Sequence, residues 1–286
     1  MDLDNLQQSS NVEDRRGSGG GGGVALGGGL GIGGVIIAVI FGLISGQNPL
    51  QILGSLTGGS SSQSYNSSSQ LPQDDARAVE ISRVLKSTEQ QWTKIFAASN
   101  RQYREPGLVL YNGATDTVGC GGAQAEVGPF YCPGDRKIYI DLRFFDQLSS
   151  TAGQNDFARA YVIAHEVAHH VQNELGVLDQ VNARRQQSDE RTSNALSVRV
   201  ELQADCLAGI WANKAQNSLQ LTQADIREGL AAASSVGDDT LQREAGRRVV
   251  SDNFTHGSSA QRQRWFTKGF QGGSVQGCDT FSTNQI

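Results

Sequence analysis

The chain has 286 residues, of which 37% are hydrophobic, and a formal net charge of −5 at pH 7. That length and apolar content are sufficient for one large domain or two small ones with a hydrophobic core. The acidic balance argues against a nucleic-acid-binding protein, which normally carries a basic surface. Many of the 35 glycines lie before residue 60, so the remainder has the composition of an ordinary globular domain.

An apolar stretch from Val24 to Ser45 is the first predicted element. As a helix it would be about 33 Å long, sufficient to cross a hydrocarbon core of about 30 Å. Arg15 and Arg16 precede it, and no Lys or Arg follows until Arg77. The positive-inside rule therefore predicts a cytoplasmic N-terminus and an extracytoplasmic remainder. A cleaved signal peptide is the main alternative, although acidic residues beside the two arginines are atypical of one.

The chain accordingly divides into four predicted parts: a cytoplasmic Gly-rich N-terminus at 1–23, a transmembrane helix at 24–45, a flexible linker at 46–73 and a folded domain at 74–286. The linker is rich in Ser, Gly, Gln and Asn, which bury too little apolar surface to fold. Glycines four residues apart in the apolar stretch could let two such helices pack as a homodimer, or could simply continue the preceding glycine tract.

Four cysteines lie in the part that this topology sends across the membrane, and an even number in an oxidising space predicts disulfides. The favoured pairs are Cys120 with Cys132, which closes a short turn-rich loop, and Cys206 with Cys278, which attaches the C-terminal tail to a helix. Four reduced thiols are the alternative if the topology is wrong. Zinc ligation by cysteine is disfavoured, since no two cysteines have the close spacing typical of thiolate sites.

The folded domain begins with a predicted amphipathic helix at residues 76–97. Three short strands are predicted next, at 108–111, 129–132 and 137–142. From residue 156 the pattern is helical almost to the C-terminus, with breaks at 176–189, 217–222, around Gly237 and at 253–257. Strands followed by helices, without β-α-β alternation, predict an α+β fold that is mostly helical with a small, mainly antiparallel sheet.

The predicted helix after residue 156 carries the sequence HEVAH, which contains His165, Glu166 and His169. Residues four apart lie on the same face of a helix, so both imidazoles can bind one metal ion. Two imidazoles supply half of a tetrahedral zinc site, and the intervening glutamate can take a proton from the activated water. This H-E-x-x-H pattern is typical of zinc peptidases. It predicts one Zn²⁺ per chain.

A third ligand is expected on a later helix, because the histidine that follows this motif closely in some zinc peptidases is absent. The sequence ELQAD supplies Glu201 as a carboxylate ligand and, one turn later, Asp205 as the acceptor for the far nitrogen of a ligating histidine. Apolar residues surround this pair, where an unpaired carboxylate would be costly. Glu174 is the reserve candidate, but it follows the two histidines too closely on the same helix.

Several motifs together resemble one protein family: HEVAHHVQ, ELQADCLAG, FTHGSSAQRQRWF, NVEDRRG near the start, and GPFYCPGDRKIYIDLRFF before the zinc-binding helix. They are similar to the bacterial membrane-anchored neutral zinc metallopeptidases over nearly the whole chain, and least so in the linker. The resemblance implies a zincin domain of the minigluzincin type, in which the edge of a small sheet lines the substrate groove. With the predicted anchor, it implies a single-pass protein of the bacterial inner membrane whose catalytic domain is periplasmic.

Three further residues have predicted roles near these motifs. His256 precedes a helix, in a motif similar to the histidine-containing loop that membrane-associated gluzincins place near their metal. It could stabilise a developing oxyanion, or only hydrogen-bond its local turn. Tyr131, on an expected edge strand, is a second candidate for oxyanion stabilisation, with packing as its alternative. His170 is expected to be structural, since it points about 100° away from the neighbouring ligand.

The expected function is therefore that of a membrane-anchored zinc endopeptidase, which hydrolyses a peptide or protein substrate with activated water and Glu166 as general base. The substrate is expected to lie along a sheet edge and to make main-chain hydrogen bonds there. The alternative is a catalytically inactive zinc-binding protein with a structural or interaction role at the membrane. A closed site with four protein ligands would favour that alternative.

Overall fold

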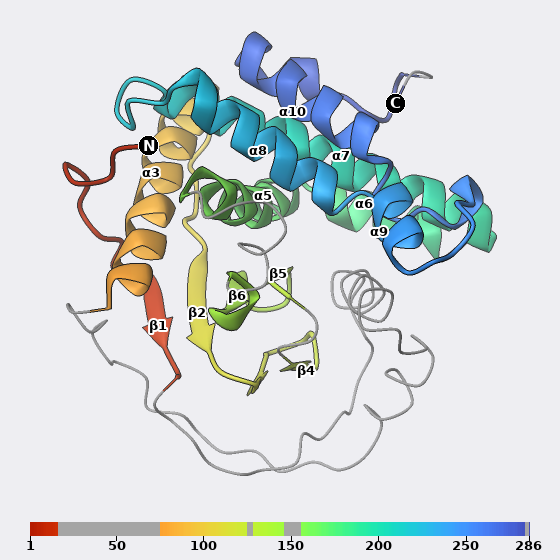
Figure 1. Cartoon of the computed structure of the whole chain (residues 1–286), viewed down its shortest axis with the longest axis horizontal. Helices are drawn as coiled ribbons and strands as arrows, with labels where there is room; N and C mark the ends of the chain where they lie inside the picture. The colour runs from red at the N-terminus through yellow and green to blue at the C-terminus, as the bar shows by residue number, and fades with distance from the viewer. Residues whose placement is uncertain (17–74, 125–127, 146–155, 284–285) are drawn as a thin grey trace.

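A layer of helices lies over a small sheet in the computed structural model, which describes residues 1–16, 75–124, 128–145, 156–283 and 286 (Figure 1). The strands are β1 (Val12–Asp14), β2 (Gly107–Tyr111), β3 (Ala114–Asp116), β4 (Gly122–Gln124), β5 (Phe130–Cys132) and β6 (Lys137–Asp141). The helices are α3 (Ala76–Ala98), α5 (Asp156–Glu174), α6 (Val177–Arg185), α7 (Glu190–Ala215), α8 (Gln223–Ser235), α9 (Asp238–Glu244) and α10 (Ser259–Gly272), with short 3₁₀ helices η2 (Ser251–Asn253) and η3 (Val275–Cys278).

The four-stranded sheet has the order β1-β2-β6-β5 and is mixed. β1 and β6 both run parallel to β2, whereas β5 is antiparallel to β6. The prediction of a mainly antiparallel sheet is therefore wrong. Parallel strands need a long crossover connection, and residues 112–136 provide it for β2 and β6 through the antiparallel β3–β4 pair and β5.

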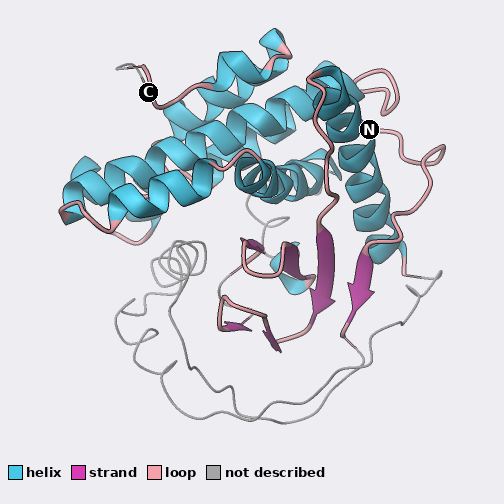
Figure 2. Cartoon of the chain, turned by 180° about the vertical axis from the view of Figure 1, so that it is seen from behind, coloured by secondary structure: helices cyan, strands magenta, loops and turns pink. Residues whose placement is uncertain are grey.

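Residues 1–16 belong to the same folded unit as the helices (Figure 2). β1 pairs with β2 so that Val12 lies opposite Leu108. The carboxylate of Glu89 on α3 is fully buried and accepts hydrogen bonds from Ser9 at 2.5 Å and from Asn11 at 2.8 Å. The expectation that the folded part begins near residue 74 is therefore wrong. A strand of three residues that includes two acids carries no apolar alternation by which it could be recognised.

The two ends of the segment 17–74 meet at one place on the molecule. The guanidinium of Arg16, at the end of the N-terminal part, forms an ion pair of 2.5 Å with Asp75, the N-cap of α3. The predicted span and linker lie outside the described residues; within the described ranges, no helix is long and apolar enough to cross a membrane.

The helices agree with the sequence pattern except in two regions, 176–189 and 245–250; the second was expected to be helical, but α9 ends at Glu244 and the chain continues as a turn and an extended stretch. α3 occupies almost the predicted range, and the ends of α7, α8 and the start of α10 match predicted breaks. The predicted break at 176–189 instead contains α6, because Gly176, with φ of 75°, redirects the chain and a new helix starts at the next residue. Val181 packs against Leu196 and Val200 and holds α6 on α7.

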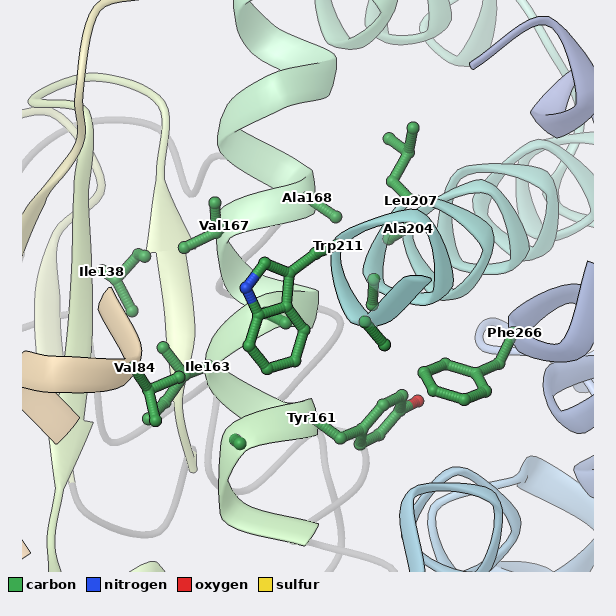
Figure 3. Packing of buried hydrophobic residues seen from close by; sticks show 14 of the residues in the cluster. Val84, Ile138, Tyr161, Ile163, Val167, Ala168, Ala204, Leu207, Trp211 and Phe266 are labelled. Atoms are coloured by element: carbon green, nitrogen blue, oxygen red, sulfur yellow. The ribbon is translucent and has the colours of Figure 1, made fainter. Parts of the chain in front are cut away.

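The hydrophobic core lies between α5, α7 and the sheet (Figure 3). Trp211 of α7 is fully buried; its ring stacks on Phe157 of α5, and its indole N–H donates to Ser87 of α3. Tyr161 of α5 meets Phe266 of α10 edge to face, with ring centroids 5.6 Å apart. Each large buried side chain contributes about 1.5–3 kcal/mol. These contacts therefore fix the relative orientation of α5 and α7, the two helices that carry the predicted ligands.

α7 and α10 cross with their backbones in contact. A Cβ atom at Gly269 would lie 1.8 Å from the carbonyl oxygen of Cys206, and one at Gly209 would lie 2.2 Å from the carbonyl oxygen of Phe266. A larger residue at either position would push the two helices apart. The crossing therefore places the first turn of α10 against the middle of α7.

Both predicted disulfides are present. Cys120 is bonded to Cys132 with a Cα–Cα distance of 5.9 Å, and Cys206 to Cys278 with 5.6 Å. The first connects the turn before β4 to β5, and the second attaches η3 to α7. The predicted pairing is confirmed, and the C-terminal tail is covalently tied to the helix that carries Glu201.

Candidate metal centre

The three predicted ligands converge on one point. His165 and His169 of α5 and Glu201 of α7 each offer a ligand atom, and these atoms lie within 4.8 Å of one another. Nε2 of His165 lies 3.1 Å from one oxygen of Glu201, and Nε2 of His169 lies 3.5 Å from the other. Two imidazole nitrogens and a carboxylate are the donor set of catalytic zinc sites with an open fourth position. Glu174, the reserve candidate, instead forms an ion pair with Arg136.

Each histidine of the pair is oriented through the ring nitrogen that faces away from Glu201. Nδ1 of His165 lies 2.9 Å from Asp205, and Nδ1 of His169 lies 2.9 Å from the side-chain oxygen of Gln172. An N–H donated to either oxygen leaves Nε2 free to bind a metal. The structure thus places Asp205 where the sequence placed it. Gln172 was missed, although its position one turn after His169 on the same helix was a usable signal.

Arg262 of α10 holds Asp205 in turn. Both side chains are buried, and the guanidinium donates to the two carboxylate oxygens over 2.8 and 3.0 Å. The hydroxyl of Tyr161 donates to the same carboxylate. Burial opposes ionisation of Asp205, but the Arg262 charge and the contact with His165 outweigh it and hold the pKa of Asp205 below its usual range. Arg262 had no assigned role in the sequence analysis.

The protein groups of the site differ sharply in protonation. Burial works against the charged form of His165, but the carboxylates of Asp205 and Glu201 outweigh it and raise its pKa to about 9. Burial lowers the pKa of His169 to about 4. Burial also opposes ionisation of Glu201, yet the nearby histidines, His169 first, bring its pKa far below its usual range. The site therefore holds a permanent negative charge on Glu201, which favours a cation.

Glu166 lies next to the ligands and differs from Glu201 in its environment. Its side chain is buried, and among the described residues Oε2 has no hydrogen-bond partner. Burial raises the pKa of Glu166 to about 8, against an opposing effect of His165. A carboxyl group with a pKa near neutrality can both accept and release a proton. Glu166 therefore has the properties of a general base.

His256, in the loop before α10, faces the same site. Asp238 fixes the loop by accepting the backbone N–H groups of Thr255, His256 and Gly257, and it lies 3.3 Å from Nδ1 of the His256 ring. The ring lies close enough to Glu201 to contribute to the lowered pKa of that carboxyl. Nε2 of His256 is buried and lacks a hydrogen-bond partner within the described part of the chain. The structure thus brings His256 to the metal centre.

Tyr131 and His170 form a separate contact between the sheet and α5. Nε2 of His170 donates to the carbonyl oxygen of Arg104, so its Nδ1 accepts from the hydroxyl of Tyr131. Asn173 donates to the same hydroxyl. These neighbours use the Tyr131 hydroxyl, which favours the packing alternative over oxyanion stabilisation: Tyr131 packs the sheet on α5. His170 is fully buried and structural, as expected.

Comparisons with known proteins agree with this site. The family described as "Putative neutral zinc metallopeptidase" matches residues 1–281. The uncharacterized protein YpfJ of Escherichia coli (strain K12) is 44% identical over 279 residues, which are 96% of each chain. The uncharacterized protein Rv2575 of Mycobacterium tuberculosis (strain H37Rv) is 45% identical over 196 residues, 64% of this chain and 65% of its own. No solved structure matches the chain. The chain therefore belongs to the neutral zinc metallopeptidase family.

Proposed function

We propose that the protein is a zinc-dependent endopeptidase with a zincin-type site. The observation that carries this proposal is the convergence of His165, His169 and Glu201 beside the buried carboxyl of Glu166. Two imidazole nitrogens and one carboxylate suit zinc better than magnesium or calcium, which prefer sites made of oxygen ligands. Membership of the family supports the same assignment.

The chain's own residues account for the proton transfers and charge stabilisation that hydrolysis requires. Zinc in such a site acts as a Lewis acid that activates water for attack on a carbonyl carbon. Glu166 accepts the proton of the attacking water and then donates it to the leaving amine. His256 is positioned by Asp238 through Nδ1, and in its doubly protonated form its Nε2 donates to the carbonyl oxygen as negative charge develops there.

The edge of β5 supports a mode of substrate binding. β5 pairs with β6 on one side, and in the described part of the chain its other side has no partner strand. The backbone of Tyr131 on β5 favours the ionised form of Glu166, so this strand borders the site. A peptide added along the free edge would make main-chain hydrogen bonds and would present its carbonyl groups next to Glu166.

The variant Glu166→Gln tests the proposal. In the full chain loaded with zinc, we expect wild type to cleave unstructured casein, and Glu166→Gln to retain about one zinc per chain but lose more than 99% of the activity. Glu174→Gln, on the same helix but paired with Arg136 and not with the ligand cluster, is the control and should keep its activity. One bound zinc with no cleavage by wild type would instead favour a structural or interaction role.

We also propose that the protein associates with the inner membrane and that residues 1–16 and 75–286 lie together outside the cytoplasm. The two disulfides support an oxidising location, and the pairing of β1 with β2 requires both parts on one side. Exposed single cysteines introduced by Ser10→Cys and Gln271→Cys test this. Both cysteines should react with an impermeant maleimide in intact cells. Reaction of Gln271→Cys alone would instead support a chain that crosses the membrane once, with residues 1–16 in the cytoplasm.

A further inference from the structure

Arg185, at the C-terminal end of α6, has an incompletely paired guanidinium. Its Nε donates to the hydroxyl of Ser193 on α7 at 3.0 Å. Among the described residues, the two Nη groups make no hydrogen bond or ion pair, although the side chain is half-buried. Partly buried arginines normally meet a carboxylate or several carbonyl oxygens, because removal of a charge from water is costly. The two Nη groups of Arg185 are therefore available to a ligand.

The position of Arg185 relates it to the metal centre. Ser193, Ser197 and Glu201 follow one another at intervals of four residues, so they lie on one face of α7. Ser193 is therefore about 12 Å from Glu201 along the helix axis, and the Arg185 side chain extends from α6 onto this face. Glu201 is the carboxylate whose charge acts on Arg185. Arg185 thus lies about two helical turns before Glu201, on the side of α7 that α6 covers.

The charge of Arg185 is poorly compensated. Burial lowers the pKa of its guanidinium, and Glu201 only partly opposes this effect. Glu201 also contacts both histidines of the ligand cluster. A metal ion bound there would neutralise the negative charge of Glu201, and that charge would no longer compensate the positive charge of Arg185. The two Nη groups of Arg185 are positively charged and half-buried, and they lie near the peptidase centre. Such a pair of donors can bind a carboxylate through two parallel hydrogen bonds.

We propose that Arg185 binds a carboxylate of the peptide substrate and thereby sets specificity. The carboxylate is an acidic side chain or the free C-terminus, about three or four residues from the scissile bond, since an extended chain advances about 3.3 Å per residue. This proposal rests on the proposed peptidase function. Arg184 is the matched comparison, because it is the preceding residue of the same helix, carries the same charge and is exposed.

Two pairs of fluorogenic peptides test the proposal with the zinc-loaded full chain. One pair differs by Glu against Gln four residues from the cleaved bond, and the other by a free against an amidated C-terminus. We expect wild type to cleave the carboxylate member of one pair with a kcat/KM about 10–100-fold higher, the range for a charged hydrogen-bonded pair. Arg185→Gln should remove that preference, whereas Arg184→Gln should retain it. The responding pair identifies the source of the carboxylate.

Binding measurements separate this proposal from the proposed function. The same peptides, labelled for fluorescence anisotropy, are titrated into Glu166→Gln and into Glu166→Gln with Arg185→Gln, which do not need to turn over. A carboxylate preference that is present only with Arg185 supports the proposal even if wild type cleaves no peptide. Equal binding of both members of each pair by Glu166→Gln overturns it, as does an equal loss for all peptides with Arg185→Gln, because Arg185 would then only anchor α6 to Ser193.

Discussion

The guanidinium of Arg262 donates hydrogen bonds to both carboxylate oxygens of Asp205, over 2.8 and 3.0 Å, and both side chains are buried. The carboxylate in turn lies 2.9 Å from Nδ1 of His165. Arg262 therefore acts on the metal centre through Asp205. The close crossing of α7 and α10, which depends on Gly209 and Gly269, is what allows the pair to form.

Arg262→Gln tests this connection. We expect zinc affinity to fall about 10–100-fold, the usual effect of loss of a group that orients a metal ligand. We also expect the free energy of unfolding to fall by about 3–5 kcal/mol, because the buried carboxylate of Asp205 loses its bidentate charge partner. Arg264→Gln, exposed on the same helix, is the control for charge. Competition with a zinc chelator and urea unfolding measure the two effects; unchanged zinc affinity in a folded Arg262→Gln protein would contradict the argument.

The ligand set could be predicted from sequence because helical spacing determines it. His165 and His169 are one turn apart, and Glu201 and Asp205 repeat that spacing on a second helix, so each pair shares a face regardless of the rest of the fold. Arg262 could not be placed in this way. Its contact with Asp205 depends on how α10 crosses α7, and no local pattern in the sequence specifies that crossing.

Zinc binding should depend on pH because of His165. Its pKa of about 9 means that, below pH 9, the ring carries a proton that a metal must displace. Apparent zinc affinity should therefore rise about tenfold per pH unit from about 7 to 9 and then level off. Calorimetry at pH 7.5 in buffers of different ionisation enthalpy should show release of at least one proton. Glu166, with a pKa of about 8, adds to this release, and Glu166→Gln removes its share.

The same groups determine how the stability of the metal-free protein changes with pH. The pKa values of His165 and Glu166 are raised by folding, so each group binds its proton more tightly in the folded state. Their contribution is present at low pH and is lost as the pH rises toward about 8–9. Urea unfolding of chelator-treated protein should therefore show a lower free energy of unfolding at pH 9 than at pH 7. Asp205→Asn, which removes the carboxylate that raises the pKa of His165, should reduce this difference.

The two disulfides should differ in their contribution to stability. Cys206 and Cys278 are 72 residues apart in sequence, and Cys120 and Cys132 are 12 apart. Loop-closure entropy then gives about 4 kcal/mol for the longer loop and about 3 kcal/mol for the shorter one. Paired Cys→Ala substitutions, compared by urea unfolding of the metal-free protein, should show the larger loss for the Cys206–Cys278 pair. The opposite order would indicate that strain or residual structure dominates over loop length.

The N-terminal strand β1 could not be predicted from the sequence, in contrast to β2, β6 and α3. β2 and β6 were recognisable because apolar residues dominate them, and α3 because its apolar residues recur with helical spacing. β1 is stabilised instead by contacts with distant residues, such as the pairing of Val12 with Leu108 and the hydrogen bonds of Ser9 and Asn11 to Glu89. An intervening stretch that is apolar enough to cross a membrane also made a division of the chain at residue 74 the simpler interpretation.

A chain that begins at residue 75 should consequently fail to fold stably. Without residues 1–16, the buried carboxylate of Glu89 loses Ser9 and Asn11, and β2 loses its parallel neighbour. Each unsatisfied group of this kind costs about 1–3 kcal/mol, and the exposed edge of β2 promotes aggregation. Circular dichroism and size-exclusion chromatography of residues 75–286 should therefore show an expanded or aggregated protein.

A synthetic peptide of residues 1–16 should restore the fold when it is added to residues 75–286, because the contacts of β1 are non-covalent. The scrambled peptide is the control for charge and composition, and Ser9→Ala in the full chain isolates one contact, with an expected loss of about 1–3 kcal/mol. Recovery of a cooperative unfolding transition and of zinc binding with the native peptide alone would show that β1 completes the domain. If residues 75–286 alone form a stable, zinc-binding protein without the peptide, the N-terminal segment is not part of the folded domain, as its sequence first suggested.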